Sequence, residues 1–192
     1  MEFKDVVFGR RSIRKYTEEP VSEEDLRYIM EAGLLAPSGV NLQPWYFVVI
    51  RSKEQMERLV NVMSGVSDKL VDGLNERFSK HPEVAQESIR FIKMLGGAPV
   101  VILAFRYRTD YPKTDVTIVQ SIAAAMENIV LAAYDRGLGT CWMTAPVETM
   151  DDTALRDMFA PDKGNLVAMI TLGHPEGEAR PVARKDGRYV II

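Results

Sequence analysis

The chain carries RRSIRKY at Arg10–Tyr16 and APSGVNLQPWYF at Ala36–Phe47, and these two stretches decide its fold. Between them, SEED at Ser22–Asp25 is typical of a helix start, because an N-cap serine accepts a hydrogen bond from the backbone three residues on. The helix should end at about Leu35, since the residue before a proline is pushed out of the α region. The order is therefore a basic extended segment, a capped helix and a proline-rich turn.

The composition is that of a single globular domain over residues 1–192. Hydrophobic residues make up 46% of the chain and charged residues 27%, both ordinary fractions for a folded protein. A chain of this length can bury about 70% of its unfolded surface. The net charge of −3 argues against non-specific nucleic-acid binding, which depends on neutralising phosphates.

The compartment is predicted from cysteine content and apolar runs. Cys141 is the single cysteine, so no intrachain disulfide forms and a reducing cytoplasm is expected. The N-terminal residues MEFKDVVFGRR lack the long apolar run of a signal peptide. We expect that no apolar stretch reaches the roughly 18 residues of a membrane span. We therefore expect a cytoplasmic protein with neither a membrane nor a nucleic acid as partner.

Hydrophobic periodicity predicts alternating helices and strands. The expected helices are Phe3–Gly9, Ser22–Leu35, Lys53–Met63, a long one from Thr114 or Asp115 to Arg136, and Asp151–Phe159. The expected strands are Trp45–Ile50, Pro99–Phe105, Asn165–Leu172 and a short one at Tyr189–Ile192. The more polar segment 66–95 predicts one or two mobile helices. This pattern indicates an α+β or α/β domain with the long helix near its centre.

The arginine segment, Arg10–Tyr16, predicts an anion site. On an extended backbone Arg10, Ser12 and Arg14 project to one side, and Arg11 and Ile13 to the other. Two guanidinium groups and a hydroxyl on one face suit a phosphate, because arginine binds oxyanions in a bidentate, charge-assisted way. The alternative is a solvated basic turn that pairs with nearby glutamates.

The turn at Pro37–Trp45 offers amide groups for a ring. The side chains of Asn41 and Gln43 carry both donors and acceptors, as the edge of a uracil-like ring requires. Proline, glycine and asparagine also make turns for their own reasons. The alternative is a structured loop with Trp45 in the core.

A third stretch, GLGTCWMTA at Gly137–Ala145, can bring backbone close to a flat ligand. It is not a dinucleotide fingerprint, because it follows a helix and lacks the third glycine. Cys141 is a candidate nucleophile, but neither His81 nor His174 is placed by sequence to activate it. A small buried thiol is the alternative that we favour.

The C-terminal tail carries Arg184 and Lys185, either as a second phosphate clamp or as part of a solvated arm. Two motif classes are missing from the sequence. Two histidines and no CxxC leave no pattern for a zinc site, and no GxxxxGK[ST] occurs.

In this order and spacing, RRSIRKY, PSxxNxQPW and GLGTCW resemble the nitroreductase family of FMN-dependent oxidoreductases, over essentially the whole chain. The resemblance implies an α+β fold with a central mixed, mostly antiparallel sheet flanked by helices and a long central helix. It also implies a domain-exchanged homodimer with two FMN sites at the subunit interface.

The resemblance also assigns cofactor residues. The phosphate, ribityl chain and pyrimidine edge would be held by Arg10, Arg11, Ser12 and Arg14, with Arg184 or Lys185 clamping the phosphate from the tail. The partner subunit would line the ring with Pro37, Ser38 and Asn41, while Gln43 would reach FMN or support the loop. The other ring edge would pass Trp142, Met143, Thr144 and Ala145, with a backbone N–H near flavin N5. Some relatives carry a glutamate at the position of Thr144.

The implied chemistry is ping-pong. NADH or NADPH would pass a hydride to flavin N5 and leave, and a nitroaromatic, a quinone or a similar electrophile would follow it. The flavin carries this chemistry, so no side-chain catalyst and no metal are expected. Substrate contacts are expected in the segment 66–95, from Phe78, His81, Phe91 and Met94, unless it forms only dimer contacts.

Three alternatives stay open. The same fold could support reductive dehalogenation, enone reduction or flavin breakdown. A flavin-binding protein that stores or senses FMN would bind it tightly without oxidising NAD(P)H. A basic-tail interaction module would be colourless.

Overall fold

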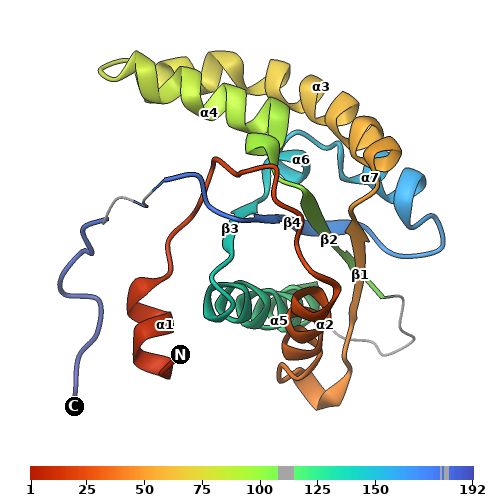
Figure 1. Ribbon diagram of the computed structural model, residues 1–192, viewed down its shortest axis with the longest axis vertical. Coiled ribbons are helices and arrows are strands. Elements are labelled where there is room, and N and C mark those ends of the chain that lie inside the picture. Colours follow the sequence, from red (N-terminus) through yellow and green to blue (C-terminus); the bar gives the residue numbers. More distant parts are fainter. Residues whose placement is uncertain (108–114, 178, 180–181) are drawn as a thin grey trace.

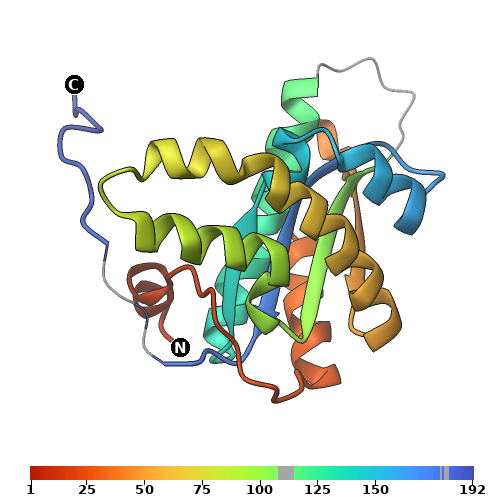
Figure 2. The same ribbon diagram turned by 90° about the horizontal axis from the view of Figure 1, so that it is seen from above.

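The computed structural model describes residues 1–107, 115–177, 179 and 182–192. Figure 1 shows three layers, with α3 (Lys53–Arg77) and α4 (Pro82–Met94) above the sheet and α2 (Glu23–Leu34) and α5 (Asp115–Asp135) below it. Figure 2 shows the same layers from above. The chain is an α+β protein, as the sequence predicts.

The sheet has four strands in the order β1-β2-β4-β3. The strands are β1 (Trp45–Ile50), β2 (Val100–Arg106), β3 (Gly139–Met143) and β4 (Leu166–Gly173), and their pairings are antiparallel. The expectation of a mixed sheet is therefore wrong for these strands, and the parallel component is an isolated bridge between Ser12 and Thr140. Continuous burial of β2 and β4 explains their uninterrupted apolar sequences, because both faces of the sheet are covered.

The lower layer is built on α5. Its buried face packs with α2 against the sheet, and the Asn128 amide donates to the carbonyl of Ala32 in α2 at 3.0 Å. By length and composition α5 could cross a membrane, which corrects the expectation that no segment does so. Eight of its residues are buried, so its apolar character is that of a core helix. The cap expected at Thr114 lies outside the described residues.

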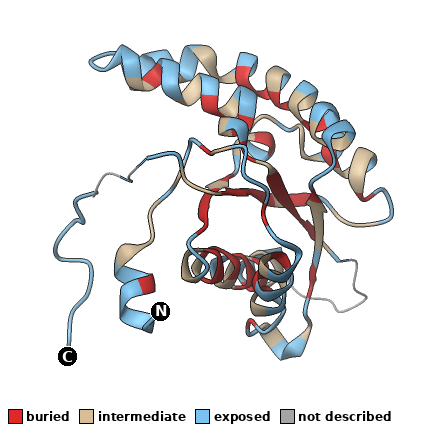
Figure 3. Cartoon of the chain, viewed as in Figure 1, coloured by how far each residue is buried: buried red, intermediate tan, exposed pale blue. Residues whose placement is uncertain are grey.

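The upper layer corrects one predicted boundary. A single 25-residue helix, α3, runs through the point at Met63 where the sequence predicts an end. The part of α3 that follows Met63 packs on α4. The buried Ser67 hydroxyl of α3 donates a 3.0 Å hydrogen bond to the Ile89 carbonyl of α4. Figure 3 shows buried positions on the inner sides of both helices and exposed positions on their outer sides.

The remaining elements are short. They are α1 (Phe3–Gly9), α6 (Ala145–Glu148), α7 (Asp152–Phe159) and the 3-10 turns η1 (Gly39–Asn41) and η2 (Leu95–Gly97). The sequence predicts α1 and α7, but not α6 or β3. The strand expected at Tyr189–Ile192 does not form, and these four residues are highly exposed, in a tail that ends away from the rest of the chain (Figures 1 and 2). A strand needs a neighbouring backbone to pair with, and none of the described residues provides one for the tail.

Candidate functional site

The arginine segment is extended, as predicted, and lies along the start of β3. The backbone N–H of Ile13 donates to the carbonyl of Thr140 at 2.8 Å, and Tyr16 forms an antiparallel bridge with Pro175. The segment is therefore held at its middle by β3 and at its C-terminal end by the residues that follow β4. This fixes the backbone that carries Arg10, Ser12 and Arg14.

A pocket of about 640 Å³ opens beside this segment, and we call it the arginine pocket. Its volume is within the roughly 300–1,000 Å³ usual for cofactor sites. The charged groups of its wall are Arg10, Arg11, Arg14, Lys15, Arg184, Glu87 and Glu176, and Ser12 adds a hydroxyl. Five cations against two carboxylates favour an anionic ligand.

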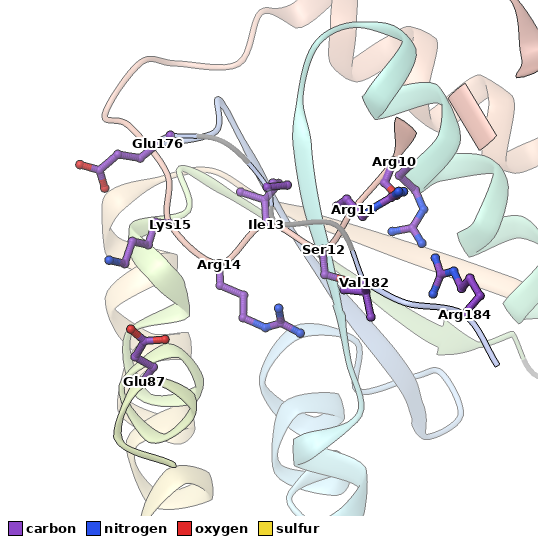
Figure 4. A pocket seen from close by; sticks show the side chains of 12 residues that line it. Arg10, Arg11, Ser12, Ile13, Arg14, Lys15, Glu87, Glu176, Val182 and Arg184 are labelled. Carbon is purple, nitrogen blue, oxygen red and sulfur yellow. The ribbon is translucent and has the colours of Figure 1, made fainter. Parts of the chain in front are cut away.

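Two arginines from opposite ends of the chain meet at this pocket. Figure 4 shows the guanidinium groups of Arg10 and Arg184 pointing toward one another, and that of Arg14 pointing into the space below Ser12. Two facing cations repel one another unless an anion lies between them. This donor set fits the phosphate of FMN, with Arg14 and Ser12 further along the same wall.

Two expected cofactor residues do not point a free cation into the arginine pocket. The Arg11 guanidinium donates to the carbonyls of Phe8 at 2.8 Å and Arg10 at 2.7 Å, so it caps the end of α1 although its side chain borders the pocket. Lys185 is exposed and does not line the pocket, whereas Arg184 does. The structure thus brings only one of the two tail cations to the site.

Glycines let the arginine segment approach its neighbours. A Cβ on Gly96 would lie 2.3 Å from the carbonyl oxygen of Arg14, and its φ of +65° is one that glycine adopts without strain. A Cβ on Gly139 would lie 2.6 Å from the side chain of Ile13. Close packing of the segment therefore requires glycine at both positions.

Cys141 lies in β3 behind the arginine segment. It is 4% exposed, and burial raises the pKa of its thiol against the opposing effects of Arg14 and Ser12. A thiol with a raised pKa is a poor nucleophile near neutral pH. The buried-thiol interpretation is therefore the one that the structure supports.

The end of β3 carries four expected ring contacts, and none of them lines the arginine pocket. Met143 is buried and Trp142 half-buried in β3, while Thr144 and Ala145 begin α6. The Thr144 hydroxyl donates to a carboxylate oxygen of Glu148 at 2.6 Å. An acidic group thus lies beside Thr144 after all, one helical turn further along. The Ala-Pro pair after Thr144 signals this helix start.

The turn at 37–43 is ordered by its own side chains. Ser38 Oγ accepts from the backbone N–H of Gln43 at 2.9 Å, and Gln43 Nε2 donates to Asn41 Oδ1 at 2.9 Å. Val40, Asn41 and Gln43 all have positive φ, which is costly for a β-branched residue such as Val40. Gln43 therefore supports the loop and orients the amide of Asn41.

This turn lies far from the arginine pocket within one chain. Figure 1 places it at the lower right between α2 and β1, while the arginine segment rises on the left from α1. The arginine pocket is not lined by any of the four expected residues of this turn, and neither is the second pocket described below. These residues are Pro37, Ser38, Asn41 and Gln43. The structure thus separates the two motifs that the sequence places closest together.

A second pocket, of about 490 Å³, lies against α4, and we call it the apolar pocket. Phe78, Phe91 and Met94 line it, as expected for substrate contacts. His81 does not, because it precedes α4 with its side chain 69% exposed and 3.4 Å from Glu83. Among the residues that the structure describes, no cluster of three or more His, Cys, Asp or Glu side chains could hold a metal.

Comparison with known proteins gives one family and several relatives. The model of the nitroreductase family matches residues 7–174. An Archaeoglobus fulgidus protein named "Putative NADH dehydrogenase/NAD(P)H nitroreductase" is 30% identical over 176 residues, which cover 90% of this chain and 85% of that protein. The iodotyrosine deiodinase of Thermotoga neapolitana is 24% identical over 179 residues, covering 90% of this chain and 88% of that one.

A solved structure gives the same picture for the fold. It is described as a "putative nitroreductase in complex with FMN" from Desulfovibrio desulfuricans and is 29% identical to this chain. The superposition has a TM-score of 0.69 and covers 95% of this chain and 93% of that chain.

Proposed function

The chain belongs to the nitroreductase family, and we propose that it binds FMN in the arginine pocket and uses it to oxidise NADH or NADPH and reduce an electrophilic acceptor. The acceptor class is nitroaromatics, quinones or similar compounds, and donor and acceptor use the site in turn. The observation that carries this proposal is the convergence of Arg10, Arg14 and Arg184 on one pocket.

The phosphate would lie between Arg10 and Arg184. Their facing guanidinium groups need an anion, and a phosphate accepts bidentate hydrogen bonds from each. Binding would convert a repulsive pair into two attractive ones. It would also fix the tail, because the described residues 182–192 around Arg184 form no helix or strand.

Arg14 and Ser12 would face the ribityl chain and the pyrimidine edge of the ring. When bound, FMN supplies the hydride transfer, accepting two electrons from NAD(P)H and giving them to the acceptor. The guanidinium of Arg14 would stabilise negative charge that builds up at that edge. No side chain of this site has to act as an acid or base.

A second copy of the chain would complete the site. The turn at 37–43 has a costly backbone and lies away from the pocket of its own chain, so we propose that it lines the flavin ring of a partner. Apolar side chains on α1 and in the tail are exposed, with Phe3 at 75% and Ile191 at 88%. Apolar surface of this kind marks an interface. A homodimer would bury it.

The experiment is an anaerobic titration of the purified protein with NADH and with NADPH, followed by absorption. Oxidised flavin peaks that bleach with either nucleotide, and return with a nitroaromatic or quinone, are the expected result. A yellow protein that fails to bleach would favour FMN storage. A colourless protein that does not take up added FMN would overturn the proposal.

Reductive dehalogenation is a second candidate, because one relative is an iodotyrosine deiodinase. The two candidates differ in their products. Iodide released from an iodinated phenol, with no turnover of nitroaromatics, would favour dehalogenation over nitro reduction.

A further inference from the structure

The apolar pocket adjoins the arginine pocket. Arg14, Lys15 and Glu87 line both of them. A ligand in the apolar pocket would therefore lie against the same arginine as a cofactor in its neighbour. This is the position required of an acceptor that exchanges electrons with that cofactor.

The inner wall of the apolar pocket suits a flat ring. Phe78, Phe91, Val84 and Met94 supply apolar surface, and the Arg14 guanidinium lies 5.9 Å from the centre of the Phe91 ring. Aromatic side chains stack on flat aromatic ligands, and methionine adapts to their outline. Ser88 adds a hydroxyl to this wall, but that hydroxyl donates to the carbonyl of Val84 at 2.8 Å, so it offers a ligand only its acceptor.

The rim of the apolar pocket is cationic. Its charged groups are Arg14, Lys15 and Arg90 against the single carboxylate of Glu87. Figure 4 shows Lys15 and Glu87 on the same side of the arginine segment with their charged ends turned toward one another, and Arg14 belongs to the proposed cofactor site. Arg90 is exposed and has no ion pair within the described part of the chain. Lys15 has no ion pair there either, but Arg14 and Lys15 also line the arginine pocket, so Arg90 is the described cation that lines the apolar pocket alone.

We propose that the apolar pocket selects aromatic acceptors that carry a carboxylate, with the ring against Phe78 and Phe91 and the carboxylate at Arg90. This inference rests on the proposed function, since it names the acceptor class of that oxidoreductase. Arg90 is thus a specificity-determining residue, because it discriminates between acceptors without contacting the cofactor.

The test compares 4-nitrobenzoate with 4-nitrobenzyl alcohol, which differ in the charged group. In the FMN-loaded protein, Arg90→Gln should lower the ratio of kcat/KM for the acid to kcat/KM for the alcohol by about twofold to fivefold, the range of an exposed charge pair. Lys93→Gln is the matched control, because Lys93 is an exposed cation on the same helix that does not line the pocket. It should leave the ratio unchanged.

Binding of benzoate and benzyl alcohol, measured by calorimetry, gives a readout that needs no turnover. Benzoate should bind more tightly than the alcohol, and Arg90→Gln should remove most of that preference. Turnover of both nitro compounds with a ratio that is equal in the Arg90→Gln and Lys93→Gln proteins would overturn the inference and leave the proposed function standing. Selective benzoate binding without turnover of either nitro compound would support the pocket and contradict the proposed function.

Discussion

The hydroxyl of Tyr16 donates a 2.7 Å hydrogen bond to the carbonyl oxygen of Ile13, three residues earlier in the arginine segment. The same hydroxyl lies 2.7 Å from the hydroxyl of Thr171 in β4, and Tyr16 is only 6% exposed. Since the N–H of Ile13 is bonded to Thr140, both backbone groups between Ser12 and Arg14 are held. Tyr16 is therefore a positioning residue for the cationic wall of the site.

Tyr16→Phe should loosen the arginine segment. The substitution leaves the part-buried carbonyl of Ile13 without this partner and the Thr171 hydroxyl with only its 3.4 Å bond to the Cys141 carbonyl, which costs about 1–3 kcal/mol of unfolding free energy. FMN affinity should fall as well, because Arg14 is carried by the released backbone. Tyr189→Phe, at an exposed tyrosine, is the control. Chemical denaturation and FMN titration measure the two effects, and unchanged FMN affinity would show that Tyr16 serves the core alone.

The two tail cations should differ in their effect on FMN. Arg184→Gln should weaken FMN binding by roughly 1 kcal/mol, about fivefold, because it removes one side of the facing pair at a partly open site. Lys185→Gln removes the same charge from a side chain outside the pocket and should have no such effect. Fluorescence titration of the apoprotein with FMN measures both. Equal losses would mean that only the net charge of the tail matters.

Gly96→Ala should destabilise the protein, since its Cβ would meet the Arg14 carbonyl and its φ is positive. A loss of about 1–3 kcal/mol is expected. Gly65→Ala is the matched control, because Gly65 lies within α3 with nothing within 4 Å of its added Cβ. Alanine there should stabilise α3 by about 0.5–1 kcal/mol. Thermal unfolding of both variants checks the opposite signs.

Stability should fall at alkaline pH because of Cys141. Burial raises the pKa of its thiol in the folded protein. When the pH rises above the ordinary thiol pKa of about 8.5, the unfolded chain therefore loses this proton before the folded protein does. The unfolded state then binds fewer protons, and the unfolding free energy falls by up to about 1.4 kcal/mol per pH unit until the folded thiol also titrates. Cys141→Ala should flatten this slope between pH 8 and 10. A slope that is identical in the variant would contradict a raised pKa.

Sequence patterning predicted the fold where local signals agreed with the tertiary contacts. Apolar and β-branched runs identified β1, β2 and β4, which pair side by side in the structure. The strand β3 was missed because its Gly-Thr-Cys start is atypical of a strand, and its pairing with β4 provides what its composition does not. The extent of α3 was missed because its second half is polar on the surface and is held by α4.

The candidate site was likewise predicted from the sequence only where its geometry is local. Alternation along an extended segment predicted that Arg10, Ser12 and Arg14 share one side, and they do line one pocket. Arg11 and Ile13, expected on the other side, border the same pocket, so strict alternation does not describe its wall. The capping role of Arg11 depends on where α1 ends, which the spacing of charges does not show. The position of the turn at 37–43 relative to a flavin depends on a second chain and stays a prediction.

The claim that the arginine pocket holds the phosphate of FMN is tested most directly by comparing FMN with riboflavin, which lacks that phosphate. We predict that the wild-type apoprotein binds FMN roughly 30-fold more tightly than riboflavin, as two arginine–phosphate contacts of about 1 kcal/mol each would give. In Arg10→Gln/Arg184→Gln this difference should shrink toward equality through loss of FMN affinity, with riboflavin affinity nearly unchanged. A difference that persists in the double variant, or none in the wild type, would contradict the account.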